Sequence, residues 1–344
     1  MPEQGWGWWL GFNGTVLAML ALDLGVFHRR SHEVKFKEAL LWSIVWTVVA
    51  LVFNFGLWVG WLGQYPAADR GRVAVEFLQG YIIERSLSFD NLFVFAVIFT
   101  YFAVHSRYQH RVLFWGILGA LIFRALFIFG GLWLIEKFHW MIYVFGAFLV
   151  YTGIKLAVAK EKEIQPEKNP VLRLARAVLP VSAHYDAGRF FTRVDGRRLA
   201  TPLLLVLLFL ETTDVVFALD SIPAIFGVTR DPFIVYTSNV FAILGLRALY
   251  FVLAAVMRMF RYLSVGLAVL LVFIGGKMVV EAWLGQHMHS GISLAIVMLI
   301  LTVAVLASVL SPDKSPAPAA ENPAPTPPDS PAAPAGERPA PPGI

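Results

Sequence analysis

Six oxygen-bearing side chains that could bind a cation lie within two otherwise apolar segments of the chain. They are Glu84, Asp90, Asn91, Glu211, Asp214 and Asp220. An ionised Asp at the centre of a lipid bilayer costs at least about 2.5 kcal/mol, so such residues usually face a cavity, a partner or a passing ion. We therefore interpret the acids as ligands of a cation or as steps of a proton pathway.

The spacing of Glu211, Asp214 and Asp220 predicts how these three acids lie on a helix. Glu211 and Asp214 are three residues apart and share one face, whereas Asp214 and Asp220 are separated by about 9 Å along the axis and about 120° around it. Pro223 cannot donate to the Leu219 carbonyl and its ring crowds that group, which predicts a bend and a released carbonyl oxygen. A carbonyl beside carboxylates would complete a cation site.

The ligand types indicate which metals would fit such a site. Carboxylate, amide, hydroxyl and carbonyl oxygens are hard donors, which suit Mn²⁺, Mg²⁺ or Ca²⁺ without separating them. The chain has no cysteine, and its eight histidines fall in predicted loops or at the ends of predicted spans. A zinc or copper site in the bilayer is therefore poorly supported, and we expect no permanently bound cofactor.

The alternative is that the acids form buried ion pairs that only fix helix packing. The basic residues available inside the predicted spans are Arg85, Arg124, Lys155, Arg247 and Lys277. For these cations we favour a role as counter-charges. For the acids we favour a cation or proton pathway, because carboxylates recur at matching positions of two segments.

The composition indicates an all-α polytopic membrane protein. Of the 344 residues, 58% are hydrophobic and 15% are charged, and the mean hydropathy is +0.67. Apolar runs of about 20 residues predict about nine transmembrane helices, at about 6–27, 39–62, 75–104, 112–135, 140–158, 200–227, 233–257, 263–284 and 290–310. The net charge of +5 lies mainly in loops, where topology explains it without a nucleic-acid partner.

Loop charges predict the orientation of the chain and its division into regions. Lys and Arg concentrate in alternate loops, which places the N-terminus outside and the C-terminus in the cytoplasm. The predicted regions are 1–74 with two N-terminal spans, 75–158 with three helices, 159–199 as a basic cytoplasmic loop, 200–284 with three helices, 285–310 with the last span, and 311–344 as a Pro- and Ala-rich disordered tail.

The sequence indicates that regions 75–158 and 200–284 form an internal repeat. Glu84 and Asp90 have the same spacing as Asp214 and Asp220. Two further matches follow in the same order, Arg124 with Arg247 and Lys155 with Lys277. Because each block holds three helices, the second must enter the membrane from the opposite side, which is the inverted-repeat arrangement of many transporters.

These segments resemble the TerC family of bacterial integral membrane proteins, which includes Alx-type members. The resemblance covers residues 8 to 310 and rests on four stretches, 21–27, 37–40, 84–95 and, most specifically, 211–223. It implies Mn²⁺ export across the plasma membrane, a link to tellurite resistance and alkaline pH response in parts of the family, and a fold like that of LysE-type transporters. It also implies that the five acids are functional.

Three functions stay open on the sequence. The first is a transporter that exports a hard divalent cation, with protons as a candidate exchange ion and membrane lipid as its surroundings. The second is a membrane-bound redox modulator or tellurite-resistance protein, for which the chain supplies no thiol; an intramembrane protease is disfavoured because no Gly-x-Gly-Asp stretch is present. The third is a non-transporting metal or pH sensor. We expect no enzyme activity, and the sequence does not indicate an oligomeric state.

Overall fold

A computed structural model describes residues 4–25, 36–158, 169–256 without 183, 187 and 195, and 262–310. Side chains at 22–25 and 254–256 are likewise not described. The predicted tail at 311–344 and the first part of the basic loop, 159–168, lie outside these residues.

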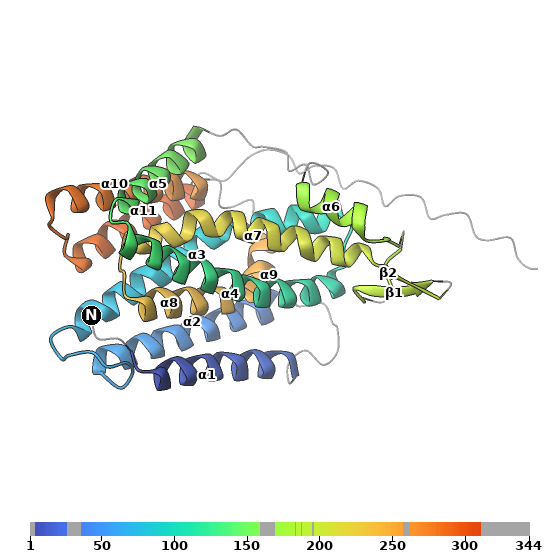
Figure 1. The fold of residues 1–344 in the computed structure, drawn as a ribbon, viewed down its shortest axis with the longest axis horizontal. Coiled ribbons are helices and arrows are strands. Elements are labelled where there is room, and N and C mark those ends of the chain that lie inside the picture. Colours follow the sequence, from blue (N-terminus) through green and yellow to red (C-terminus); the bar gives the residue numbers. More distant parts are fainter. Residues whose placement is uncertain are drawn as a thin grey trace, which may run out of the picture. The chain divides into compact units, whose positions relative to one another are not determined.

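The described chain is almost entirely helical (Figure 1). The helices are α1 (Trp6–Gly25), α2 (Phe36–Val59), α3 (Arg70–Tyr101), α4 (Ser106–Lys137), α5 (Met141–Val158), α6 (Pro170–Val178), α7 (Pro202–Phe226), α8 (Pro232–Leu244), α9 (Leu246–Val256), α10 (Leu263–Leu284) and α11 (Ser290–Leu310). The strands β1 (Phe191–Val194) and β2 (Arg197–Ala200) form an antiparallel hairpin. The region predicted as a basic loop thus contains the short helix α6 and this hairpin.

Each of the nine predicted apolar runs overlaps a helix, but fewer helices meet the requirements for crossing a membrane. Among the described residues, six helices are long and apolar enough, or up to seven if the bent pair of α8 and α9 is one span. Helices α1 and α3 are the exceptions. Glycines and Asn13 lower the hydropathy of α1, and Glu84, Arg85 and Asp90 interrupt the apolar character of α3. Nine spans stay a prediction.

Helix α8 lies at the centre of the packing and is buried along nearly its whole length. Helices α2, α3 and α4 pack against it, and α7 packs against α3 and α4 (Figure 1). The most extensive helix pair is α5 with α10, where Gly146 and Gly275 allow close contact, since a Cβ at Gly275 would lie 2.6 Å from the Gly146 carbonyl oxygen. The acids are thus surrounded by helices on several sides.

Two irregularities adjust this packing. Helices α8 and α9 meet at Gly245 with a bend of 44°, and the guanidinium of Arg85 lies against that glycine. Helix α7 continues through Pro223 to Phe226, and the bend and the released carbonyl expected there stay predictions. Beyond it, the Lys277 ammonium of α10 donates to the Gly227 carbonyl at 2.8 Å and so caps the C-terminal end of α7.

Candidate cation site

Helices α3 and α7 carry all six predicted site residues and pack against each other. Glu84 and Asp214 are buried, with 0% and 3% of their surface exposed. Both lie next to α4, which packs along α7. The helices therefore bring acids that are 130 positions apart in the chain to one buried place.

Arg124 of α4 is at the centre of that place and is 1% exposed. Its Nη1 donates to Glu84 Oε1, to Ser221 Oγ at 3.3 Å and to Asn239 Oδ1 at 3.2 Å. Its Nη2 donates to Asp214 Oδ1 at 3.4 Å. One guanidinium thus connects α3, α4, α7 and α8, which explains why a full charge is stable in this apolar surrounding.

Three carboxylate oxygens near this centre have no hydrogen-bond partner. Arg124 binds one oxygen of Glu84 and one of Asp214, while Glu84 Oε2 and Asp214 Oδ2 are buried and unpaired. Glu211 Oε2 is also buried and unpaired. A buried polar atom without a partner costs about 1–3 kcal/mol, and more when charged. These oxygens are suited to accept a proton or a cation.

Glu211 reaches α4 at Gly119, the residue before Ala120, which lines the same cavity as Asp214. A Cβ at residue 119 would lie 2.1 Å from Glu211 Oε1, so no larger residue fits while that carboxylate keeps its position. The close approach of an acid to a helix backbone thus depends on a glycine.

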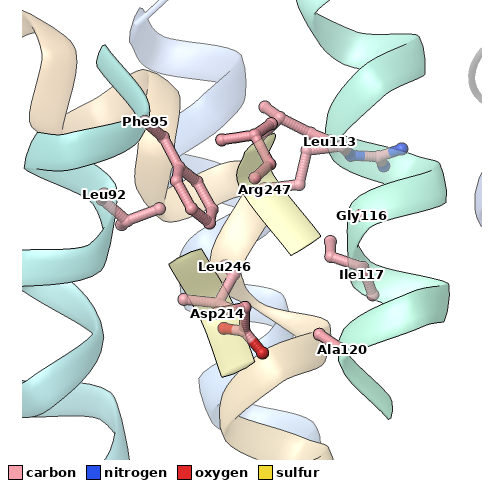
Figure 2. Close-up of a pocket in the computed structure, with 10 residues that line it drawn as sticks. Leu92, Phe95, Leu113, Gly116, Ile117, Ala120, Asp214, Leu246 and Arg247 are labelled. Atoms are coloured by element: carbon pink, nitrogen blue, oxygen red, sulfur yellow. The ribbon is translucent and has the colours of Figure 1, made fainter. Parts of the chain in front are cut away.

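A small cavity of about 20 Å³ adjoins Asp214 (Figure 2). It is lined mainly by apolar side chains, with Asp214 and Arg247 as its charged members. This volume holds about one water molecule. The cavity therefore gives Asp214, which is 3% exposed, room for one small ligand.

A second polar group lies at the contact of α7 with α5 and includes Asp90 of α3. The Thr152 hydroxyl donates to the Asp220 carboxylate, and Lys155 and Asp90 lie near enough to interact with Asp220 electrostatically. Asp90 and Asp220 are only partly buried. This group contains two of the predicted site acids and one of the predicted counter-charges.

The structure therefore divides the predicted site residues. Glu84, Asp214 and Glu211 belong to the Arg124 group, and Asp90 and Asp220 belong to the Lys155 group. Asn91 is buried beside Asp90 in sequence. In the part of the chain that is described, three or more His, Asp or Glu side chains nowhere converge with a spacing that could hold a metal ion. The guanidinium accounts for this in the first group, because it lies between two of the acids.

Three contributors to the site were not predicted from the sequence. Asn239 accepts from Arg124, Thr152 binds Asp220, and Gly119 contacts Glu211. The run Thr237, Ser238 and Asn239 inside an apolar helix is the signal that could have identified the first. Two other predicted counter-charges have different partners: Lys277 pairs with Glu281 at 3.2 Å, and Arg247, which also lines the cavity beside Asp214, contacts His110 at 3.0 Å.

Comparison with known proteins identifies the family of this chain. The profile of the "Integral membrane protein TerC family" matches residues 70–315, which include both acidic helices. The chain belongs to the TerC family. A relative in Myxococcus xanthus, named "Uncharacterized membrane protein STKORF319", is 51% identical over 318 residues, covering 92% of this chain and 96% of that protein.

Other TerC-type relatives carry a functional name. A protein of Escherichia coli K12, named "Putative membrane-bound redox modulator Alx", is 48% identical over 301 residues, covering 86% of this chain and 92% of its own length. An "Uncharacterized membrane protein" of Rickettsia bellii is 37% identical over 302 residues, with 88% and 97% covered. No solved structure matches the chain. Membership of a multi-pass membrane family agrees with the six or seven apolar helices.

Proposed function

We propose that this TerC-family protein exports a hard divalent cation, with Mn²⁺ as the leading candidate. The observation that carries the proposal is the set of unpaired carboxylate oxygens of Glu84, Glu211 and Asp214 around one buried arginine. Oxygen donors of this type bind Mn²⁺, Mg²⁺ and Ca²⁺. The cation is the transported substrate, and protons are the candidate exchange ion because carboxylates can accept them when the metal leaves.

The helix packing supports a transporter built from two related blocks. If α3, α4 and α5 correspond to α7, α8 with α9, and α10, then the contact of α4 with α7 is equivalent to that of α3 with α8, and both contacts are present. The α3–α7 and α5–α10 contacts join equivalent helices. This exchange of partners is what an inverted repeat with a site near the membrane midplane requires. It favours nine spans and a fold of the LysE type.

The proposed setting is the bacterial inner membrane, with the N-terminus outside and the C-terminus in the cytoplasm. Two features of the described residues support it: α6 carries Arg173 and Arg176 with exposed Leu174, and the hairpin after it carries further arginines. Basic amphipathic segments of this kind favour the anionic inner leaflet. A role in tellurite resistance would follow from the resemblance alone.

The name of the Alx relatives favours a second candidate, a membrane-bound redox modulator. A redox role would need a bound group or a partner to supply the electron-transfer chemistry, since the chain contains no cysteine. A visible absorbance band in the purified protein, bleached by dithionite, would support this candidate. A third candidate, a metal or pH sensor, would change its association with partners without moving metal across the membrane.

Cellular manganese content tests the export proposal. Bacteria that overproduce the wild-type protein in medium with elevated Mn²⁺ are expected to hold several-fold less manganese than cells with an empty vector. Glu84→Gln and Asp214→Asn should abolish this difference at equal protein abundance. Asp69→Asn is the matched control, because Asp69 pairs with Arg72 at the surface of α3 and lies outside both polar groups. Equal manganese content with and without the wild-type protein would contradict export.

A further inference from the structure

Arg124 stabilises the acidic centre formed by Glu84, Glu211 and Asp214, and its positive charge also repels any cation that enters this centre. A guanidinium is always protonated in a protein, so it is a fixed positive charge. It binds Glu84 Oε1 and Asp214 Oδ1 and leaves the second oxygen of each carboxylate unpaired. A cation that binds these two remaining oxygens would share both acids with the guanidinium.

The distances make that opposition strong. Arg124 Nη2 lies 3.4 Å from Asp214 Oδ1, so an ion bound to the other oxygen of the same carboxylate would be only a few ångströms farther away. Charges at such separations repel strongly when bulk water is excluded, and Glu84, Arg124 and Asp214 are each 3% exposed or less. Ser221 and Asn239 also bind the guanidinium, so it need not leave when the acids turn towards a cation.

We propose that Arg124 is a positioning residue that limits the affinity of the site so that the transported cation can be released. The proposal depends on the proposed function. Transport requires a site that binds an ion well enough to admit it and weakly enough to release it. Without a fixed positive charge, two or three buried carboxylates would hold a divalent ion too tightly to let it pass on.

The test compares affinity with transport in one variant. Arg124→Gln keeps hydrogen-bonding groups and removes the charge. In purified protein in detergent, with free Mn²⁺ measured by electron paramagnetic resonance, the dissociation constant is expected to fall at least about tenfold relative to wild type. In proteoliposomes the same variant should transport Mn²⁺ at least about tenfold more slowly. Arg124→Lys, which keeps the charge, should bind Mn²⁺ within about threefold of wild type.

Arg85→Gln is the matched control. It also removes an arginine from the helix interior, but Arg85 donates to the Ser43 hydroxyl and lies against Gly245, away from the acidic centre. Its dissociation constant for Mn²⁺ should equal that of wild type. Tighter binding in this variant as well would mean that any lost positive charge has the same effect, and the specific role of Arg124 would be overturned.

A second background keeps the test decisive if Arg124→Gln does not fold. Glu84→Gln removes one acid, and Glu84→Gln with Arg124→Gln restores the balance of charges that the single arginine change upsets. Adding Arg124→Gln in this background should again lower the dissociation constant at least about tenfold. Weaker or unchanged Mn²⁺ binding would overturn the role of Arg124. Absence of Mn²⁺ binding by the wild-type protein would instead refute the proposed function itself.

Discussion

Gly119→Ala changes the candidate site without altering any charge, so it tests the geometry of the site directly. The added methyl group would lie 2.1 Å from Glu211 Oε1, whereas ordinary contact begins at 3.4 Å. The carboxylate must therefore move by about 1.3 Å. Because it is the end of a flexible side chain, it can move without unfolding α4, and alanine is favoured over glycine inside a helix by about 1 kcal/mol.

The expected result is a stable protein with impaired transport. Displacing a ligand by about 1 Å can lower the rate of a process that depends on that ligand by up to about 100-fold. We expect Mn²⁺ flux into proteoliposomes to fall at least about tenfold, with an unfolding temperature equal to or above that of wild type. Flux is measured with a fluorescent Mn²⁺ reporter inside the vesicles, and unfolding is followed in detergent.

Gly130→Ala is the control, because a Cβ at this position of α4 meets open space. It should leave both flux and stability near the wild-type values or raise stability slightly. Wild-type flux in Gly119→Ala would refute the reasoning, since it would mean that the position of the Glu211 carboxylate does not matter for transport. A fall in stability with no folded protein would instead show that α4 cannot accept the methyl group.

Two further predictions concern stability outside the site. Burial, and after it the neighbouring Asp231, raises the pKa of Tyr65 above its ordinary value of 10.0. The unfolded chain therefore loses this proton at lower pH than the folded protein. The stabilisation by the neutral hydroxyl is complete below about pH 10 and is lost as pH rises above that value. Tyr65→Phe removes the 3.0 Å hydrogen bond to Asp231 Oδ2 and should lower stability by about 1–2 kcal/mol at pH 8. In thermal unfolding, the stability difference from wild type should shrink towards pH 11. A stability difference that does not change with pH would contradict this prediction. Lys277→Met removes the hydrogen bond to the Gly227 carbonyl and the ion pair with Glu281 and should lower stability by about 2–3 kcal/mol. The control Lys137→Met removes only a cation–π contact with Trp133 and should lower stability by less than about 1 kcal/mol. Equal losses of stability would be inconsistent with a cap on α7.

Hydrophobic run length predicted the positions of the helices well, because helices in lipid must be continuous and apolar. The number of membrane-crossing helices stays a prediction, since α1 and α3 carry polar residues that place them outside the six or seven candidate spans among the described residues. The bend at Gly245 was not predicted. That bend involves the packing of Arg85 from α3, a contact between residues 160 positions apart.

The acids were identified from the sequence because charge inside an apolar segment is costly and therefore informative. Their division into an Arg124 group and a Lys155 group was not, because it depends on how α3 crosses α7 and on which side of the crossing α4 and α5 lie. Helical spacing along one segment cannot fix such a crossing. The roles of Asn239 and Gly119 were not predicted for the same reason, since each residue contacts a side chain from another helix.

In the proposed export mechanism, buried carboxylates of α3 and α7 carry a divalent cation across the membrane. The decisive experiment is to follow Mn²⁺ accumulation in inverted membrane vesicles that contain either the wild-type protein or Asp214→Asn at equal abundance. We predict accumulation with wild-type protein and a rate near that of protein-free vesicles with the variant. Equal accumulation with the two proteins would contradict the claim that Asp214 is part of the transport site, and no accumulation with either would contradict Mn²⁺ export.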